Sequence, residues 1–123
     1  MIEATFPNAV RIRKRAEFLK LSASKQKTTV RGFLVVWGEN NLQTARLGIT
    51  ASRKIGCAVV RNRVKRLLRE FFRHNRLGMV AVDVNVIARR ESAQMSYSDV
   101  MLELKKAFRF IGVSLCSKVS SFL

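Results

Sequence analysis

The residues of this chain best suited to chemistry are the arginines and lysines between positions 53 and 76. This stretch of 24 residues holds nine Lys or Arg and a single acid, Glu70. Guanidinium and ammonium groups neutralise phosphates, and the planar guanidinium adds a two-pronged hydrogen-bonding geometry. The pattern therefore predicts that the segment binds a polyanion such as nucleic acid.

The same stretch has the apolar period of a helix. Its apolar residues fall on one stripe of an amphipathic helix: Val60, Val64, Leu67, Leu68 and Phe71. At about 100° per residue, other side chains cluster roughly opposite that stripe, namely Asn62, Lys65, Arg66, Arg69, Arg73 and Arg76, with Arg61 and Arg63 on its flanks. We therefore expect one helix face to pack on a core and the other to meet the polyanion.

The charge of the whole chain agrees with this interpretation. Lys and Arg number 24 against eight acids, which gives a net charge of +16 in 123 residues. Such self-repulsion in a compact domain favours a polyanionic partner. A merely solvated, highly soluble surface is the alternative, but solubility requires neither this magnitude nor this clustering. The length and the hydrophobic fraction of 48% predict one domain over residues 1–123.

Groups that could perform catalysis in a protein are sparse. The chain has Asp83, Asp99, six scattered glutamates and one histidine, and they do not form a metal-binding or nuclease motif. His74 is interpreted as a phosphate neighbour or surface residue rather than a general base. Cys57 and Cys116 have no metal-ligand spacing and are expected to be reduced. We expect no autonomous active site and no metal held by the protein, so any catalysis belongs to a partner.

Strand patterns flank the basic helix. Residues 30–37 are rich in β-branched and aromatic types and predict a strand. A turn at 38–41 precedes a second strand within 42–52, whose best part is 45–50. Residues 80–88 alternate valines on one face, which predicts a further strand. Residues 22–29 are polar and small, and we expect a loop there.

Helical patterns complete the order. A short helix is expected over 16–21, a helix stop at 77–78, and a final helix behind a capping box formed by Ser96 and Asp99. The seam of that helix is Met101, Leu104, Phe108, Ile111 and Leu115. The order helix, strands, helix, strand, helix predicts an α+β fold, a two-layer α/β sandwich with helices covering one sheet. Residues 118–123 are expected to be a frayed tail.

The sequence shows no export or membrane signal. No apolar run reaches the 18 or more residues needed to span a bilayer, and residues 1–14 lack the continuous apolar core of a secretory signal. We therefore expect a cytoplasmic protein with no membrane partner and no small-molecule substrate.

The motif around the basic helix resembles that of a known family. Residues Ser52 to Gly56, followed by Ala58 to Glu70, are similar to the signature of the protein component of bacterial ribonuclease P. The upstream strand 46–50, the downstream strand 83–89, the first helix around 14–18 and the last around 107–109 resemble the family as well. The resemblance covers roughly residues 10 to 112 with order and spacing intact.

The resemblance implies an enzyme whose active site is made of RNA. Its catalytic RNA removes the 5′ leader from precursor tRNA, and the small basic protein binds both that RNA and the leader. Mg²⁺ is implied in the holoenzyme, held mainly by the RNA. The implied fold has a left-handed β-α-β crossover through the basic helix, which is rare among proteins. Without the resemblance, a ribosomal or other structural RNA-binding protein is the alternative.

The resemblance also implies which residues bind. The RNA-binding set is Arg53, Lys54, Arg61, Asn62, Arg63, Lys65, Arg66, Arg69 and Arg73. The leader-binding set, whose rings would stack on bases, is Phe18, Phe33 and Phe108. Core packing is the alternative role for these three rings, and a local backbone bond is the alternative for Asn62. The chain departs from some members at Ser22 and Val36, where they carry aromatic residues.

Overall fold

The fold is a four-stranded sheet with helices on both of its faces. The computed structural model describes residues 11–40, 42, 44–75 and 81–112 with their side chains, and the backbone of 113–120. The elements in chain order are α1 (Arg15–Ser22), β1 (Lys27–Val30), β2 (Phe33–Glu39), β3 (Arg46–Thr50), η2 (Arg53–Ile55), α2 (Ala58–Asn75), β4 (Val82–Ala88), η4 (Arg90–Gln94) and α3 (Tyr97–Ser120).

The strands lie in the order β1-β2-β4-β3. β1, β2 and β4 are antiparallel neighbours, whereas β3 runs parallel to β4 and is joined to it through α2. The last strand in the sequence is therefore a central strand of the sheet, and β3 lies at its edge. Ahead of α1, Arg11 forms an isolated bridge to Leu47 along that edge.

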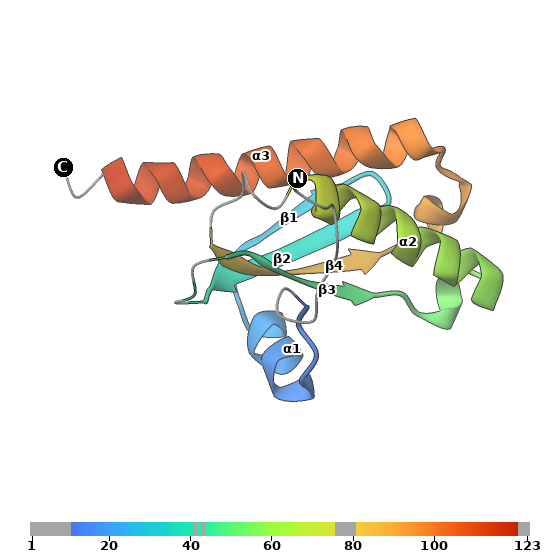
Figure 1. The fold of residues 1–123 in the computed structure, drawn as a ribbon, viewed down its shortest axis with the longest axis horizontal. Coiled ribbons are helices and arrows are strands. Elements are labelled where there is room, and N and C mark those ends of the chain that lie inside the picture. Colours follow the sequence, from blue (N-terminus) through green and yellow to red (C-terminus); the bar gives the residue numbers. More distant parts are fainter. Residues whose placement is uncertain (1–10, 41, 43, 76–80, 121–123) are drawn as a thin grey trace, which may run out of the picture.

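The hydrophobic core lies between the sheet and the pair α2 and α3 (Figure 1). The sheet contributes alternate residues, which point to the same face because the side-chain period of a strand is two: Phe33, Val35, Trp37, Leu47, Val82, Val84 and Val86. From α2 the core receives Val64, Leu68, Phe71 and Phe72. The predicted amphipathic stripe is thus confirmed at its centre, and Phe72 extends it.

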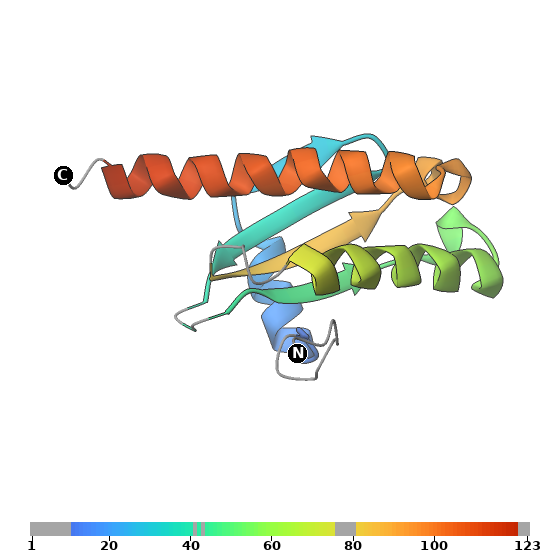
Figure 2. The same cartoon turned by 45° about the horizontal axis from the view of Figure 1, so that its top comes forward.

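α1 corrects the expected two-layer arrangement. It lies on the opposite face of the sheet from α2 and α3, as both views show (Figures 1 and 2). Leu21 packs over Gly38 of β2, and Phe18 packs over Gly48 of β3. The α+β class is confirmed, but the architecture has three layers, because the apolar residues of α1 find small residues on the second face of the sheet.

Three further expectations are corrected near the ends of predicted elements. The strand expected over 30–37 is confirmed as β2 from Phe33 onward, but the loop expected over 22–29 contains most of β1, which begins at Lys27. β1 and β2 form a hairpin, because the chain reverses between Val30 and Phe33, with Gly32 at φ +84°. A turn of this kind requires positive φ, which glycine adopts without strain. The region 118–120, expected to be frayed, continues helix α3 to Ser120.

The start of α3 agrees with its sequence pattern. The Ser96 amide donates to Asp99 Oδ2 at 3.4 Å, and the Asp99 amide donates to Ser96 Oγ at 3.1 Å. This reciprocal pair is the predicted capping box. The helix stop expected at 77–78 and the side chain of Leu115 lie outside the described residues.

Candidate nucleic-acid interface

The entry to α2 is shaped by a turn that needs a glycine. Ser52 caps the short helix η2 by accepting from the Lys54 amide at 3.3 Å. Gly56 follows at φ +148°, and a Cβ there would lie 3.1 Å from Val60. The turn leaves Arg53 and Lys54 exposed beside the first turn of α2. Gly56 therefore allows the turn that joins the segment after β3 to α2.

Cys57 lies at this entry and is exposed with a free thiol. Hydrogen bonds from the amides of Val60 and Val59 lower the pKa of its thiol below the ordinary value, and Arg61 acts in the same direction. The amides at the start of a helix stabilise negative charge, so the start of α2 favours an anion through both its backbone and Arg61. The side chain of Cys116 lies outside the described residues.

The cations of α2 divide into two groups by their surroundings. Arg63 donates to the backbone oxygen of Met95 at 2.9 Å, and Arg73 forms an ion pair with Glu70, to which His74 also bonds at 2.8 Å. These two arginines have partners within the fold. The other group makes no side-chain hydrogen bond or ion pair with the described residues and consists of Arg61, Lys65, Arg66 and Arg69, as is also true of the uncharged Asn62.

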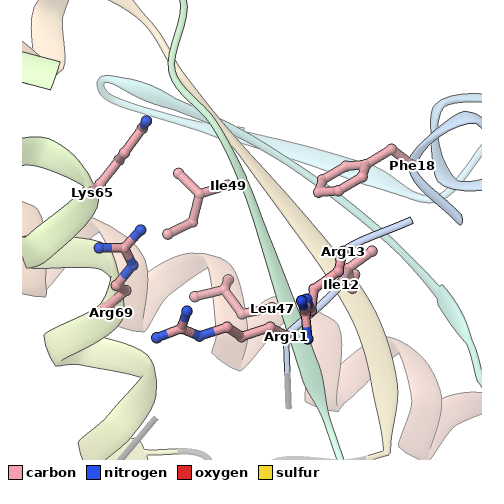
Figure 3. A pocket seen from close by; sticks show the side chains of 8 residues that line it. All are labelled: Arg11, Ile12, Arg13, Phe18, Leu47, Ile49, Lys65 and Arg69. Atoms are coloured by element: carbon pink, nitrogen blue, oxygen red, sulfur yellow. The ribbon is translucent and has the colours of Figure 1, made fainter. Parts of the chain in front are cut away.

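Lys65 and Arg69 lie one turn apart and line an open cavity of about 170 Å³ (Figure 3). The cavity extends across β3, the edge strand of the sheet, to Phe18 of α1 on the far side. Its described lining is Arg11, Ile12, Arg13, Phe18, Leu47, Ile49, Lys65 and Arg69. None of these residues is acidic. An aromatic ring and four cations therefore converge from three separate segments.

The three phenylalanines expected to form one leader site do not meet. Phe18 is half-buried in the cavity, but Phe33 is fully buried in the core on the other side of the sheet. Phe108 stacks on Phe71 with ring centroids 5.1 Å apart, also on the core side. Phe33 shares its face with Val35 and Trp37 because residues two apart in a strand point the same way. The expectation is therefore corrected for Phe33, whose ring has no face open to a base.

Arg11 and Arg13 are cavity residues that the sequence pattern did not assign to a site. They belong to a basic run at the start of the described chain, which was visible in the sequence. Their proximity to α2 depends on the bridge between Arg11 and Leu47, where the Ile12 amide donates to the Leu47 oxygen at 2.9 Å. A contact between segments so far apart in sequence leaves no local signal.

Metal-binding and membrane-spanning features were sought in the described part of the chain. There, no three His, Cys, Asp or Glu side chains gather closely enough to hold a metal ion. The donors of these residues therefore do not fit a metal centre of the protein's own. Among the same residues, none of the helices combines the length and apolar character needed to cross a bilayer.

Comparison with known proteins relates this arrangement to one family. The chain is 42% identical over 108 residues to the ribonuclease P protein component of Desulforapulum autotrophicum, covering 87% of this chain and 92% of the relative. It is 38% identical over 104 residues to that of Geotalea uraniireducens, covering 85% and 92%.

Solved structures show the same fold. The RNase P protein of Staphylococcus aureus superposes with a TM-score of 0.79 at 32% identity, covering 85% of this chain and 96% of that one. The RNase P protein of Thermotoga maritima gives 0.72 at 31% identity, covering 78% and 92%. A profile of the family described as Ribonuclease P matches residues 6–112. The chain therefore belongs to the family of bacterial ribonuclease P protein components, which are the protein subunits of an endoribonuclease whose catalyst is RNA.

Proposed function

We propose that this chain binds the catalytic RNA through η2 and α2 and holds the 5′ leader of precursor tRNA in the cavity beside Phe18. By doing so it assists removal of the leader to give the mature 5′ end. The observation that carries the proposal is the cavity itself, which one aromatic ring and four cations line around an edge strand. A single strand of RNA offers both a base to stack and phosphates to neutralise.

The proposed RNA surface comprises residues that are exposed or half-buried. Its members are Arg53, Lys54, Arg61, Asn62, Lys65, Arg66 and Arg69. Arg63 and Arg73 remain in the proposed set with a second role, because each has a partner inside the fold. Lys65 and Arg69 belong to both sites, so the leader and the catalytic RNA would approach the protein side by side.

The proposed leader site contains fewer aromatic residues than the sequence alone suggested. Phe18 is its aromatic platform, with Arg11, Arg13, Lys65 and Arg69 as phosphate contacts. Val36 lies on the same face of the sheet as Gly48, because both pair with Asn85 of β4. Because residue 36 is aliphatic and residue 22 of α1 is a serine, Phe18 is the main surface on which a base can stack. We therefore propose that the affinity for the leader depends on this single ring.

Three finer features follow from family membership and remain proposals. The crossover from β3 through α2 to β4 is inferred to be left-handed. Mg²⁺ would supply charge neutralisation and activation of water in the holoenzyme, and we propose that the RNA holds it, because the described residues do not gather three metal-binding side chains. We place the protein in the cytoplasm, where precursor tRNA is made.

The test is cleavage of a precursor tRNA by a bacterial ribonuclease P RNA at low Mg²⁺, with and without the chain. Restored cleavage at the leader junction, with none from the protein alone, is the expected result. Arg69→Ala should reduce the affinity of the holoenzyme for leader-bearing precursor, whereas Arg109→Ala, which removes an exposed cation of α3, should not. Equal affinities for precursor and mature tRNA in the unmodified holoenzyme would contradict the leader site.

A further inference from the structure

A cluster of charged side chains joins α1 to the sheet. Arg46 of β3 donates from Nε to Asp83 Oδ1 at 2.8 Å and from Nη2 to Asp83 Oδ2 at 2.6 Å. The same Nη2 donates to Glu17 Oε2 of α1 at 2.6 Å. One guanidinium therefore binds a carboxylate of β4 with two prongs and a carboxylate of α1 with one.

The cluster is largely buried, and Asn40 forms a further hydrogen bond to it. The side chains of Arg46 and Asp83 are 17% and 13% exposed, and that of Glu17 is 29% exposed. Asn40 donates to Asp83 Oδ1 and to the Thr44 oxygen, both at 3.0 Å. Hydrogen bonding to Asp83 above all, and then to Glu17, raises the pKa of Arg46 despite its burial. The guanidinium therefore stays charged and is held in one position by its carboxylate partners.

α1 has few other attachments. It is eight residues long, its N-cap Lys14 makes no side-chain cap bond, and Leu21 is its one buried residue. A helix of this length is unstable by itself in water, so contacts with the rest of the fold decide its position. Among the described residues, the Glu17–Arg46 pair is the only ion pair between α1 and the rest of the fold.

The Glu17–Arg46 ion pair lies close in sequence to Phe18 in α1 and to Gly48 in β3, the two residues in contact at the proposed leader site. Glu17 precedes Phe18 in α1, and Arg46 is two residues before Gly48 in β3. The Phe18 ring lies so close to Gly48 that a Cβ there would be 2.6 Å from Phe18 Cε1 and 2.9 Å from Cζ. A small displacement of α1 would lift this ring from the strand and change the cavity.

We propose that Arg46 is a positioning residue for the leader: by tying Glu17 to Asp83, it holds α1 so that the Phe18 ring stays over Gly48. The inference rests on the proposed role of Phe18. Arg46 need not touch RNA itself, since its three hydrogen bonds to carboxylates occupy Nε and Nη2.

Glu17→Ala tests the proposal with the least damage, because it frees α1 while leaving the two-pronged Arg46–Asp83 pair intact. Glu39→Ala is the matched control, because this substitution removes the same charge. Glu39 is exposed and lines the cavity of about 350 Å³ next to the cluster. Each variant is assembled with the catalytic RNA, and dissociation constants are measured for leader-bearing precursor and for mature tRNA, with the cleavage rate at saturating precursor.

Residues that act through one another are not additive. Glu17→Ala should therefore weaken precursor binding about three- to tenfold relative to mature tRNA, and should add little to Phe18→Ala in the double variant. The cleavage rate at saturation should not change, and Glu39→Ala should leave the precursor preference intact. Glu17→Gln, which keeps one acceptor oxygen, should restore part of the preference.

Two outcomes would overturn the proposal in distinguishable ways. If Phe18→Ala weakens precursor binding selectively but Glu17→Ala does not, or if the two effects add fully, the ion pair does not position Phe18. If Phe18→Ala affects precursor and mature tRNA equally, the leader site itself fails, and the positioning role fails with it. Melting temperatures of the free variants separate both outcomes from loss of the fold.

Discussion

Two arginines of α2 that were both assigned to the RNA-binding set have different surroundings in the structure. Arg63 reaches the backbone oxygen of Met95, just before α3. Arg66 is exposed and, among the described residues, makes no hydrogen bond or ion pair. A buried carbonyl that loses its donor is costly, whereas an exposed guanidinium is free to bind phosphate. Residue type alone cannot separate these two uses of arginine.

Arg66→Ala should weaken binding of the catalytic RNA by roughly 1–2 kcal/mol while leaving stability within about 0.5 kcal/mol of the parent. Asn62→Ala, at another exposed position of the helix, should behave in the same way. Arg63→Ala should lower the melting temperature as well as the RNA affinity. Filter binding and thermal unfolding measure the two quantities, and a large loss of stability in Arg66→Ala would place that residue in the fold.

The phenylalanines give a second contrast at this scale. Phe33→Ala should destabilise the protein by about 3–5 kcal/mol, because it leaves a cavity in the core where Phe33 is 0% exposed. Phe18→Ala should instead weaken binding of leader-bearing precursor by about 1–3 kcal/mol, the usual value of one base stacked on an aromatic ring. Chemical denaturation and holoenzyme affinity are the measurements. A stable Phe33→Ala protein with a selective leader defect would reverse the two assignments.

At the scale of elements, the sequence predicted α2, the capping box and β4, because each carries a strong local pattern. It could not predict which face of the sheet α1 covers, because an eight-residue helix with one buried leucine has no clear apolar stripe. The β1–β2 hairpin was missed because β1 is only four residues long and lies mostly within the polar segment that was expected to be a loop. The cavity required the contact between Arg11 and β3, which only the tertiary structure provides.

The hairpin is tied to α3 by Glu103, whose pH dependence can be predicted. Its carboxylate accepts from Lys106 at 3.0 Å and from the Arg31 amide at 3.1 Å, and these bonds, that of Lys106 first, lower the pKa of Glu103. A lowered pKa in the folded state adds stability at neutral pH, which is lost as pH falls below the ordinary value of 4.5.

Glu103→Gln should therefore lower the free energy of unfolding by about 1 kcal/mol at pH 7. The difference from the parent should shrink as the pH falls below 4.5, since protonation removes the same charge from the parent. Urea unfolding at several pH values measures this, with Glu39→Gln as a control at an exposed acid. A difference that stayed constant down to acid pH would show that charge at position 103 is immaterial.

At the scale of the whole molecule, α2 serves both stability and binding. Its apolar side packs with α3 on one face of the sheet, whereas α1 covers the other face (Figure 2). The cavity spans the edge strand β3 and joins the cations of α2 to Phe18 of α1. The net charge of +16 is not balanced within the chain. Lys65 and Arg69 line a cavity whose described residues include no acid, so the electrostatic term should dominate RNA affinity.

The affinity for the catalytic RNA should accordingly fall steeply with salt. If about five phosphates are neutralised, the slope of log K against log salt concentration should be about −4. Arg69→Ala should reduce its magnitude by about one, and Arg109→Ala, on the exposed side of α3, should leave it unchanged. Binding isotherms between low and physiological salt give the slope, and a value near zero would contradict the phosphate-contact surface.

The strand order has a consequence for how the chain is made. β4 lies between β2 and β3 although it is the last strand in the sequence. A nascent chain that ends before Val82 holds the hairpin, β3 and the cationic helix, but not the strand that joins them. Parallel pairing through a crossover is slow because it depends on non-local contacts. During translation, the strongly basic helix therefore emerges from the ribosome before the sheet that will support it can close.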